Sequence, residues 1–177
     1  MLTKVVLLDE LLQRHALEIG NDFTGYRNHT YRVINFCSAL STDDPEPLEK
    51  MAIAAAFHDL GIWTEKTFDY LAPSESLARA YLGESGKTEW VSEITAMIHE
   101  HHKITRYKSN PTWLVEAFRK ADSVDVSLGL ITFGLPRSFV REVLSEFPNA
   151  GFHKRLVQLS FSRLLSHPLS PLPMYRL

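Results

Sequence analysis

Apolar residues recur every three to four positions along most of this chain, a spacing that predicts helices rather than strands. The pattern predicts helices at about residues 3–18, 26–40, 46–59, 73–82, 88–102, 112–128 and 151–165, with a shorter one after Pro136. Gly61 follows the third helix and is expected to let it stop. The proline-rich stretch 167–173 cannot continue a helix and is expected to lie extended along the surface. The pattern therefore predicts an all-α fold, a helical bundle.

Length and composition indicate a single domain spanning residues 1–177. The chain is 45% hydrophobic and contains no repeat or linker that would divide it. Its formal charge of -2 gives no overall attraction to nucleic acid or to an acidic membrane. The single Cys37 excludes an intramolecular disulfide and suits a reducing compartment. Asp9 and Glu10 interrupt the first apolar run, and no apolar stretch is long enough to span a bilayer, so a cytoplasmic protein is expected.

Histidine and aspartate residues suggest a metal centre. His29 and Asp122 lie in two predicted helices, and the pair His58-Asp59 ends a third. The run before that pair, residues 51–57, is small and apolar, so the helix that it forms must be buried. A buried carboxylate is costly without a partner, and a metal ion is the simplest one; local capping or a salt bridge is the alternative. A helical bundle can direct such side chains from several helices to one interior point.

A second polar cluster, residues 99–102, contains His101 and His102. It is either a hydrophilic helix end, where cations are favourable, or part of a functional site. Basic residues that could bind phosphate lie between this cluster and Asp122: Lys103, Arg106, Lys108, Arg119 and Lys120. Lys103 and Lys120 are the preferred candidates because each adjoins a predicted site residue, although a solvated helix face is the alternative for both. The isolated histidines His15, His153 and His167 are expected to be structural.

These motifs, in this order, resemble the HD-domain superfamily of metal-dependent phosphohydrolases over about residues 25–130. The matching residues are His29 with Arg32-Val33, His58-Asp59-Leu60-Gly61, His101-His102 and Ala121-Asp122. The resemblance implies an HD-type helical domain, to which residues 131–177 add C-terminal helices and a tail. It also implies that one divalent ion (Mn, Fe, Co, Ni, Zn or Mg) is bound by His29, His58, Asp59 and Asp122.

The implied reaction is hydrolysis of a small phosphoester, a nucleotide or a related metabolite, by metal-activated water. His101 and His102 would face the substrate and assist the leaving group, Lys103 and Lys120 would hold the phosphate, and no residue is assigned to an organic cofactor. Nucleic acid and membrane are not expected partners, whereas a homo-oligomer is compatible with the sequence.

The resemblance leaves two alternative functions. Family members that bind two metal ions have a further histidine at the start of a helix, between the HD pair and the segment that matches His101-His102. Residues 73–76 contain no histidine, which favours one ion, although Glu75 could act as a ligand. An oxygenase with two irons would need that histidine. A non-catalytic binding module is the other alternative, and the presence of all four ligand residues speaks against it.

Overall fold

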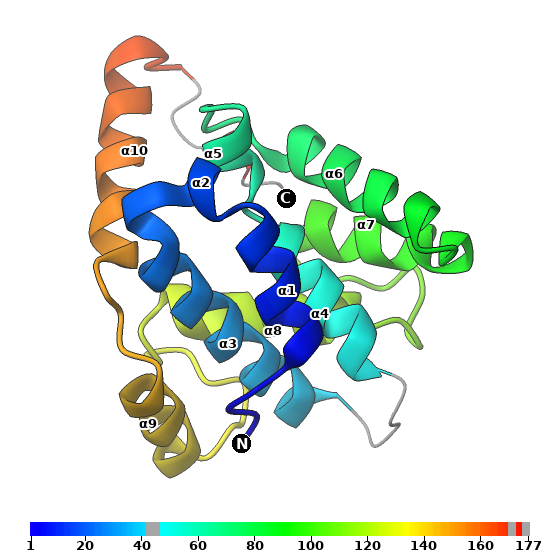
Figure 1. The fold of residues 1–177 in the computed structure, drawn as a ribbon. Helices are drawn as coiled ribbons and strands as arrows, with labels where there is room; N and C mark the ends of the chain where they lie inside the picture. Colours follow the sequence, from blue (N-terminus) through cyan, green and yellow to red (C-terminus); the bar gives the residue numbers. More distant parts are fainter. Residues whose placement is uncertain (42–46, 170–172, 175–177) are drawn as a thin grey trace.

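The computed structural model describes residues 1–41, 47–169 and 173–174, and within these ranges it contains helices and no strand (Figure 1). The predicted all-α fold is therefore confirmed. No helix in these ranges combines the length and the apolar character that crossing a bilayer requires. The helices, two of them short 3-10 helices labelled η, are α1 (Val6–Arg14), α2 (Ala16–Ile19), η1 (Gly20–Asp22), α3 (Phe23–Leu40), α4 (Pro47–Phe57), α5 (Gly61–Thr64), α6 (Leu71–Glu84), η2 (Thr88–Trp90), α7 (Val91–Glu100), α8 (Val115–Val126), α9 (Arg137–Glu146) and α10 (Phe152–Ser166).

Helix α3 forms the centre of the bundle. It packs most extensively against α8 and also against α4 and α9, and residues 28–37 are buried on every side. Helix α4 lies between α1, α3, α6 and α7, and its alanines let these helices approach closely. Residues 51–57 of α4 are apolar all round, and such a segment is stable only when neighbours cover it completely, which explains its interior position.

Two features tie the N-terminus to this centre. The Asn35 side chain bonds the backbone of Leu2, and the Tyr31 hydroxyl accepts a hydrogen bond from the backbone N–H of Val5 at 2.9 Å.

The predicted helix 3–18 is divided into α1 and α2 at His15, whose backbone leaves the helical region (φ -110°, ψ 16°). The His15 ring packs edge-on against Phe57, with ring centroids 6.1 Å apart.

Gly61 has a different role from the one predicted. Helix α4 ends at Phe57, and Gly61 begins α5 instead of stopping the preceding helix. A Cβ atom at this position would lie 2.6 Å from the carbonyl oxygen of Tyr70 and 2.9 Å from Cβ of Pro73. The Gly61 N–H also donates to Ser74 Oγ at 3.0 Å. The glycine is required because the start of α6 crosses the backbone at this point.

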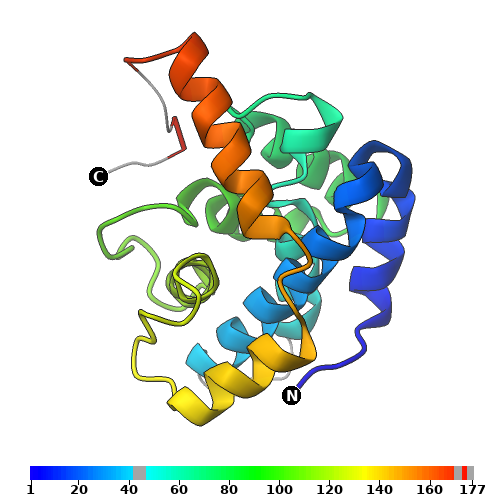
Figure 2. The ribbon, with the colours of Figure 1, turned by 90° about the vertical axis from the view of Figure 1, so that its left-hand side faces the viewer.

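The remaining elements follow the predicted order. Helix α6 begins two residues before Pro73, η2 precedes α7, and α9 begins directly after Pro136 as expected. Helix α10 runs along one side of the molecule, and its C-terminal end projects beyond its neighbours (Figures 1 and 2). Of the predicted extended tail, residues 170–172 lie outside the described residues; the residues on either side of them form turns, and Met174 is buried in the core.

Candidate metal centre

Four buried side chains from three parts of the fold meet at one point. His29 comes from α3, His58 and Asp59 from the turn after α4, and Asp122 from α8. His29 Nε2 lies 2.9 Å from His58 Nε2, 3.6 Å from Asp59 Oδ2 and 3.7 Å from Asp122 Oδ1. Donor atoms of His29, His58 and Asp59 all lie within 4.8 Å of one another, close enough for a single ion. The structure thus brings together the four residues that the sequence singled out.

Hydrogen bonds on the outer nitrogens orient the imidazole rings. His58 Nδ1 donates to the carbonyl of Ala55 at 2.8 Å, and His101 Nδ1 donates to that of Ile98 at 2.6 Å. His29 Nδ1 lies 2.6 Å from the carboxylate of Asp125. Since each Nδ1 faces an acceptor, each neutral ring directs the lone pair of Nε2 into the cluster.

A cation between His29 and His58 would relieve the repulsion of their facing lone pairs. Two bare Nε2 atoms only 2.9 Å apart repel each other. Burial lowers the pKa of His58 to about 4, so its ring is neutral near pH 7 and available as a ligand. A divalent ion accepts both lone pairs at once, so the donor set fits a metal.

The carboxylates point to the same conclusion. With neutral rings, buried Asp59 Oδ1 and His101 Nε2 face each other at 3.4 Å without a proton between them. Although burial lowers the pKa of His101, the carboxylates of Asp59 and Asp122 raise it above its ordinary value. The interior of the cluster therefore favours positive charge, which a bound cation would supply.

Asp125 completes the support of His29, and the sequence analysis missed it. Its carboxylate faces His29 Nδ1 and accepts hydrogen bonds from Arg32 Nε and, at 2.9 Å, from Arg32 Nη2. Although burial raises the pKa of Asp125, the hydrogen bonds from His29 and Arg32 lower it to about 2. Arg32 also donates to the carbonyl of Phe147 at 2.9 Å. The sequence feature that could have revealed this role is the spacing of the two aspartates: Asp125 lies three residues after Asp122, on the same face of a helix.

A second donor group overlaps the first. Donor atoms of Asp59, His101 and His102 lie within 4.8 Å of one another. His102 Nδ1 lies 3.3 Å from Asp122 Oδ2. The second donor group therefore contains Asp59 and adjoins Asp122, the two carboxylates of the four residues described first. Asp59 belongs to both groups and is the centre of the arrangement.

The cluster opens to solvent at His102. Its side chain is 11% exposed, whereas those of the other five cluster residues are at most 3% exposed. The Tyr70 hydroxyl lies 2.8 Å from His102 Nε2 and fixes the outer edge of the ring. His101 is therefore an interior member of the cluster, and His102 stands between the cluster and the surface.

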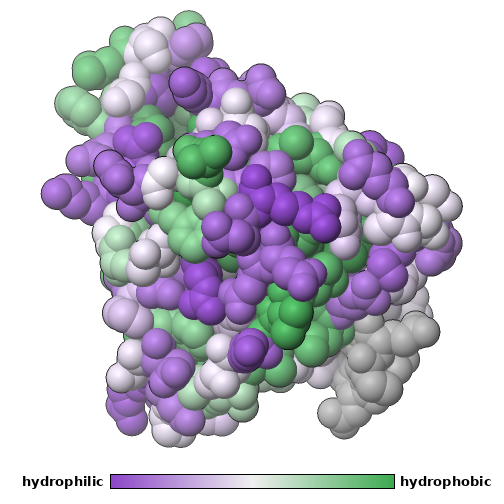
Figure 3. All heavy atoms as spheres, viewed as in Figure 1, coloured by the Kyte–Doolittle hydropathy of each residue, from purple (hydrophilic) through white to green (hydrophobic). Residues whose placement is uncertain are grey.

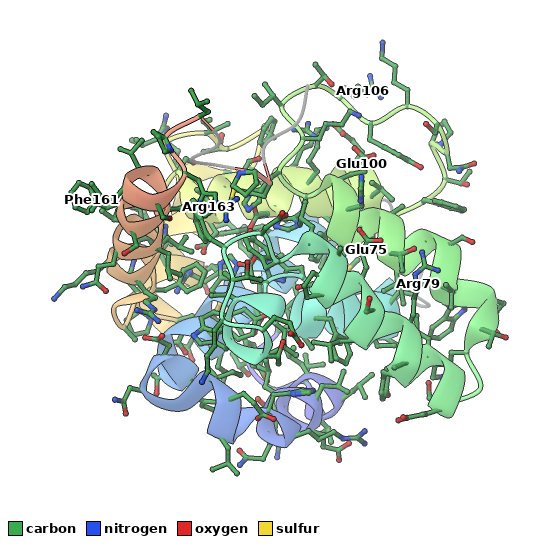
Figure 4. All side chains as sticks on the ribbon, turned by 90° about the horizontal axis from the view of Figure 1, so that it is seen from above. Glu75, Arg79, Glu100, Arg106, Phe161 and Arg163 are labelled. Atoms are coloured by element: carbon green, nitrogen blue, oxygen red, sulfur yellow. The ribbon has the colours of Figure 1, made fainter. Side chains whose placement is uncertain are left out.

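The predicted phosphate-binding lysines have acidic partners of their own. Lys103 Nζ lies 3.1 Å from Glu100, and Lys120 Nζ lies 3.6 Å from Glu116. Lys120 also lines a cavity of about 930 Å³, together with Arg106, Lys108 and Trp113; no residue of the histidine–aspartate cluster lines it. Arg119 is bonded to Glu116 and to the carbonyl of Lys103. Figure 4 shows Arg106 on its loop and Glu100 on α7.

Glu75 and the isolated histidines lie outside the cluster. Glu75, on α6, bonds His99 Nδ1 at 2.7 Å and belongs to neither donor group in the described part of the chain. Of the histidines expected to be structural, His153 bonds the carbonyl of Asp125 at 3.1 Å and so supports the centre from behind.

The comparisons with known proteins give one match. The model of the HD domain family matches residues 26–127, more than half of the chain. That segment includes every residue of both donor groups, as well as Asp122 and Asp125. No curated protein and no solved structure matches.

Proposed function

Because this chain belongs to the HD domain family, we propose that it is a metal-dependent phosphohydrolase acting on a small phosphoester. The observation that carries the proposal is the pair of Nε2 atoms of His29 and His58, 2.9 Å apart, with both Nδ1 atoms engaged elsewhere. The substrate class, a nucleotide or a related metabolite, rests on the family resemblance.

His29, His58, Asp59 and Asp122 would hold one divalent ion. When bound, such an ion lowers the pKa of a water molecule and offsets negative charge at phosphorus. Two neutral imidazoles and two carboxylates leave the bound ion with no net charge, so an anionic substrate is not repelled. Glu75 is bonded to His99 and therefore does not take the place of the further histidine that two-metal members of the family carry. This supports one ion rather than two.

The residues around the opening would position the substrate. His102 is the most exposed member of the cluster, and the hydroxyl of Tyr70 holds its ring, so it can orient the leaving group. His101 lies against Asp59 and would keep that carboxylate in place. Lys103 directly follows His102, and its ammonium would leave the partly buried pair with Glu100 to contact a phosphate. Lys120 is the second proposed phosphate contact.

A second function is favoured by one observation. Asp59 is shared by two groups of three donors, an arrangement that suits two ions bridged by a carboxylate. The family resemblance makes an oxygenase with two irons the alternative to hydrolysis, although the further histidine that such members carry is absent from residues 73–76.

Metal analysis and a substrate screen test the proposal. We expect the purified protein to hold about one ion per chain. With Mn, Co, Ni, Mg or Fe(II), it should release phosphate or a nucleoside monophosphate from a panel of nucleotides, cyclic nucleotides and sugar phosphates. Chelator, His58→Ala and Asp59→Ala should each abolish turnover and metal binding. His167→Ala changes an exposed histidine outside the centre and should leave both intact.

Two results would contradict hydrolysis at this centre. One is turnover unaffected by His58→Ala. The other is the absence of phosphoester cleavage while two bound irons consume oxygen, which would establish the alternative.

A further inference from the structure

One face of α10 carries large apolar side chains in solvent. Val157, Phe161, Leu164 and Leu165 are 68%, 60%, 44% and 71% exposed. Their spacing of four, three and one residues places them on one side of a helix. Figure 4 shows Phe161 directed away from the body, and Figure 3 shows hydrophobic residues on the projecting end of α10 at the upper left. We refer to these four residues as the α10 face.

The other side of α10 fixes which residues are exposed. Phe152 is buried and stacks on the His29 ring, with centroids 4.1 Å apart. Leu156 and Leu159 pack against the core. Because these contacts set the rotation of the helix, the α10 face is held outward by the fold. A contiguous apolar stripe of this kind marks an interaction surface.

The charged residues of the C-terminal segment are all basic. Residues 147–177 contain four Lys or Arg and no Asp or Glu, whereas residues 1–146 contain 15 Lys or Arg and 21 Asp or Glu. Lys154 is exposed, lies two helical turns before Phe161 on the same side, and forms no ion pair with any described residue. Arg155 pairs with Asp22 at the base of the helix. The C-terminal region is thus locally basic within a chain whose total charge is -2.

We propose that the α10 face docks on the surface of a membrane that contains anionic phospholipid. An apolar stripe with phenylalanine and leucine, flanked by cations and free of acidic residues, is the pattern of a helix that lies in the membrane interface. The sequence-based expectation of no membrane partner used the total charge, which conceals this local excess. The proposal is independent of the metal centre.

A second copy of the chain fits the same surface less well. Two α10 helices placed face to face would bring cations together with no carboxylate of α10 to pair with them. Stable protein interfaces also take about 20–30 residues on each side, far more than the four of the α10 face. A lipid surface needs no such matched area.

The test is co-sedimentation of the full chain with lipid vesicles. Vesicles of phosphatidylcholine alone are compared with vesicles of equal parts phosphatidylcholine and phosphatidylglycerol. We expect binding to the anionic vesicles, weaker binding at high salt and at least a tenfold loss of binding in Phe161→Asp. The matched control is Val6→Asp, which changes a side chain that is 58% exposed at the start of α1, where an aspartate is favourable.

Each other outcome overturns the proposal. Equal binding to both kinds of vesicle, or to none, removes the requirement for anionic lipid. Equal loss in Phe161→Asp and Val6→Asp shows that the α10 face is not the contact. A lipid-free dimer that Phe161→Asp dissociates, measured by analytical ultracentrifugation, would assign the face to a second copy. Thermal denaturation of both variants verifies that they remain folded.

Discussion

The carboxylate of Asp125 connects a buried arginine to a buried histidine, so its replacement should affect both metal affinity and stability. In Asp125→Asn, the ring of His29 loses its charged partner, and we expect metal affinity to fall about 10–100-fold. Arg32 would also be left without a counter-charge in the interior, which should cost about 3–5 kcal/mol in the free energy of unfolding.

Metal titration and urea denaturation measure the two effects of Asp125→Asn separately. Asp9→Asn is the control because Asp9 also bonds an arginine, Arg27, at 2.8 Å, but in a partly exposed position. It should lower stability by at most about 1 kcal/mol and leave metal affinity unchanged. If folded Asp125→Asn binds metal as tightly as the natural protein, Asp125 does not position His29.

Two glycines should respond oppositely to alanine. Gly61→Ala places a methyl group 2.6 Å from the backbone oxygen of Tyr70, so we expect a loss of about 1–3 kcal/mol and displacement of Tyr70 from His102. Gly83 lies in α6, and a new Cβ there would meet no atom within 4 Å beyond the backbone of its own helix, so Gly83→Ala should be neutral or stabilising by up to about 1 kcal/mol. Chemical denaturation measures both, and equal effects would contradict the close approach at Gly61.

At the scale of the elements, α3 should behave as the most protected helix. Its Cys37 is fully buried, and burial raises the pKa of the thiol. We expect this thiol to resist a disulfide reagent in the native protein and to react completely in urea, because reaction requires α3 to open. In the control, Cys37→Ser combined with Ser38→Cys moves the thiol to the exposed neighbouring position, where it should react at once. Equally fast labelling of both proteins would show that α3 is not protected.

Local signals in the sequence predicted most elements and their order. Apolar spacing located α3, α8 and α10 to within a few residues, and Pro136 marked the start of α9. The errors fall where tertiary packing decides. The helix predicted over residues 3–18 is interrupted at His15, which carries no breaking signal. Gly61 allows the close approach of α6, which no local pattern reveals.

The candidate site was predictable only in part, for the same reason. The four predicted metal ligands carry a recognisable motif, and the fold brings them together. Asp125 and Tyr70 meet their histidine partners across 96 and 32 positions of the chain, so only the folded structure reveals their roles. The phosphate contacts of Lys103 and Lys120 remain predictions, since both side chains pair with their own acidic neighbours.

At the scale of the whole molecule, the metal should stabilise the fold. The carboxylates of Asp59 and Asp122 repel each other, and so do the Nε2 lone pairs of His29 and His58, so a divalent ion that binds between them only in the folded chain raises its stability. At a metal concentration 100 times the dissociation constant, the gain should be about 2.7 kcal/mol. Thermal denaturation with added metal and with chelator measures it.

Two variants test whether this gain comes from the proposed centre. Asp59→Ala should stay folded and lose the metal-dependent increase in melting temperature, because Asp59 belongs to both donor groups. His167→Ala should retain the increase. A melting temperature that is insensitive to metal in the natural protein would show that the cluster does not bind an ion.

The stacking of Phe152 on His29 has a consequence for where this protein can be cut. The family match ends at residue 127, yet residues after that position pack against His29 and its helix. The carbonyl of Phe147 accepts a hydrogen bond from Arg32, and that of Pro148 accepts one from Asn28. The ring of Phe152 covers the imidazole of His29. A fragment trimmed to the homologous segment would keep every proposed ligand and lose the surface against which His29 rests. The matched segment is therefore shorter than the unit that folds, and a truncated version of this domain should retain α9 and α10.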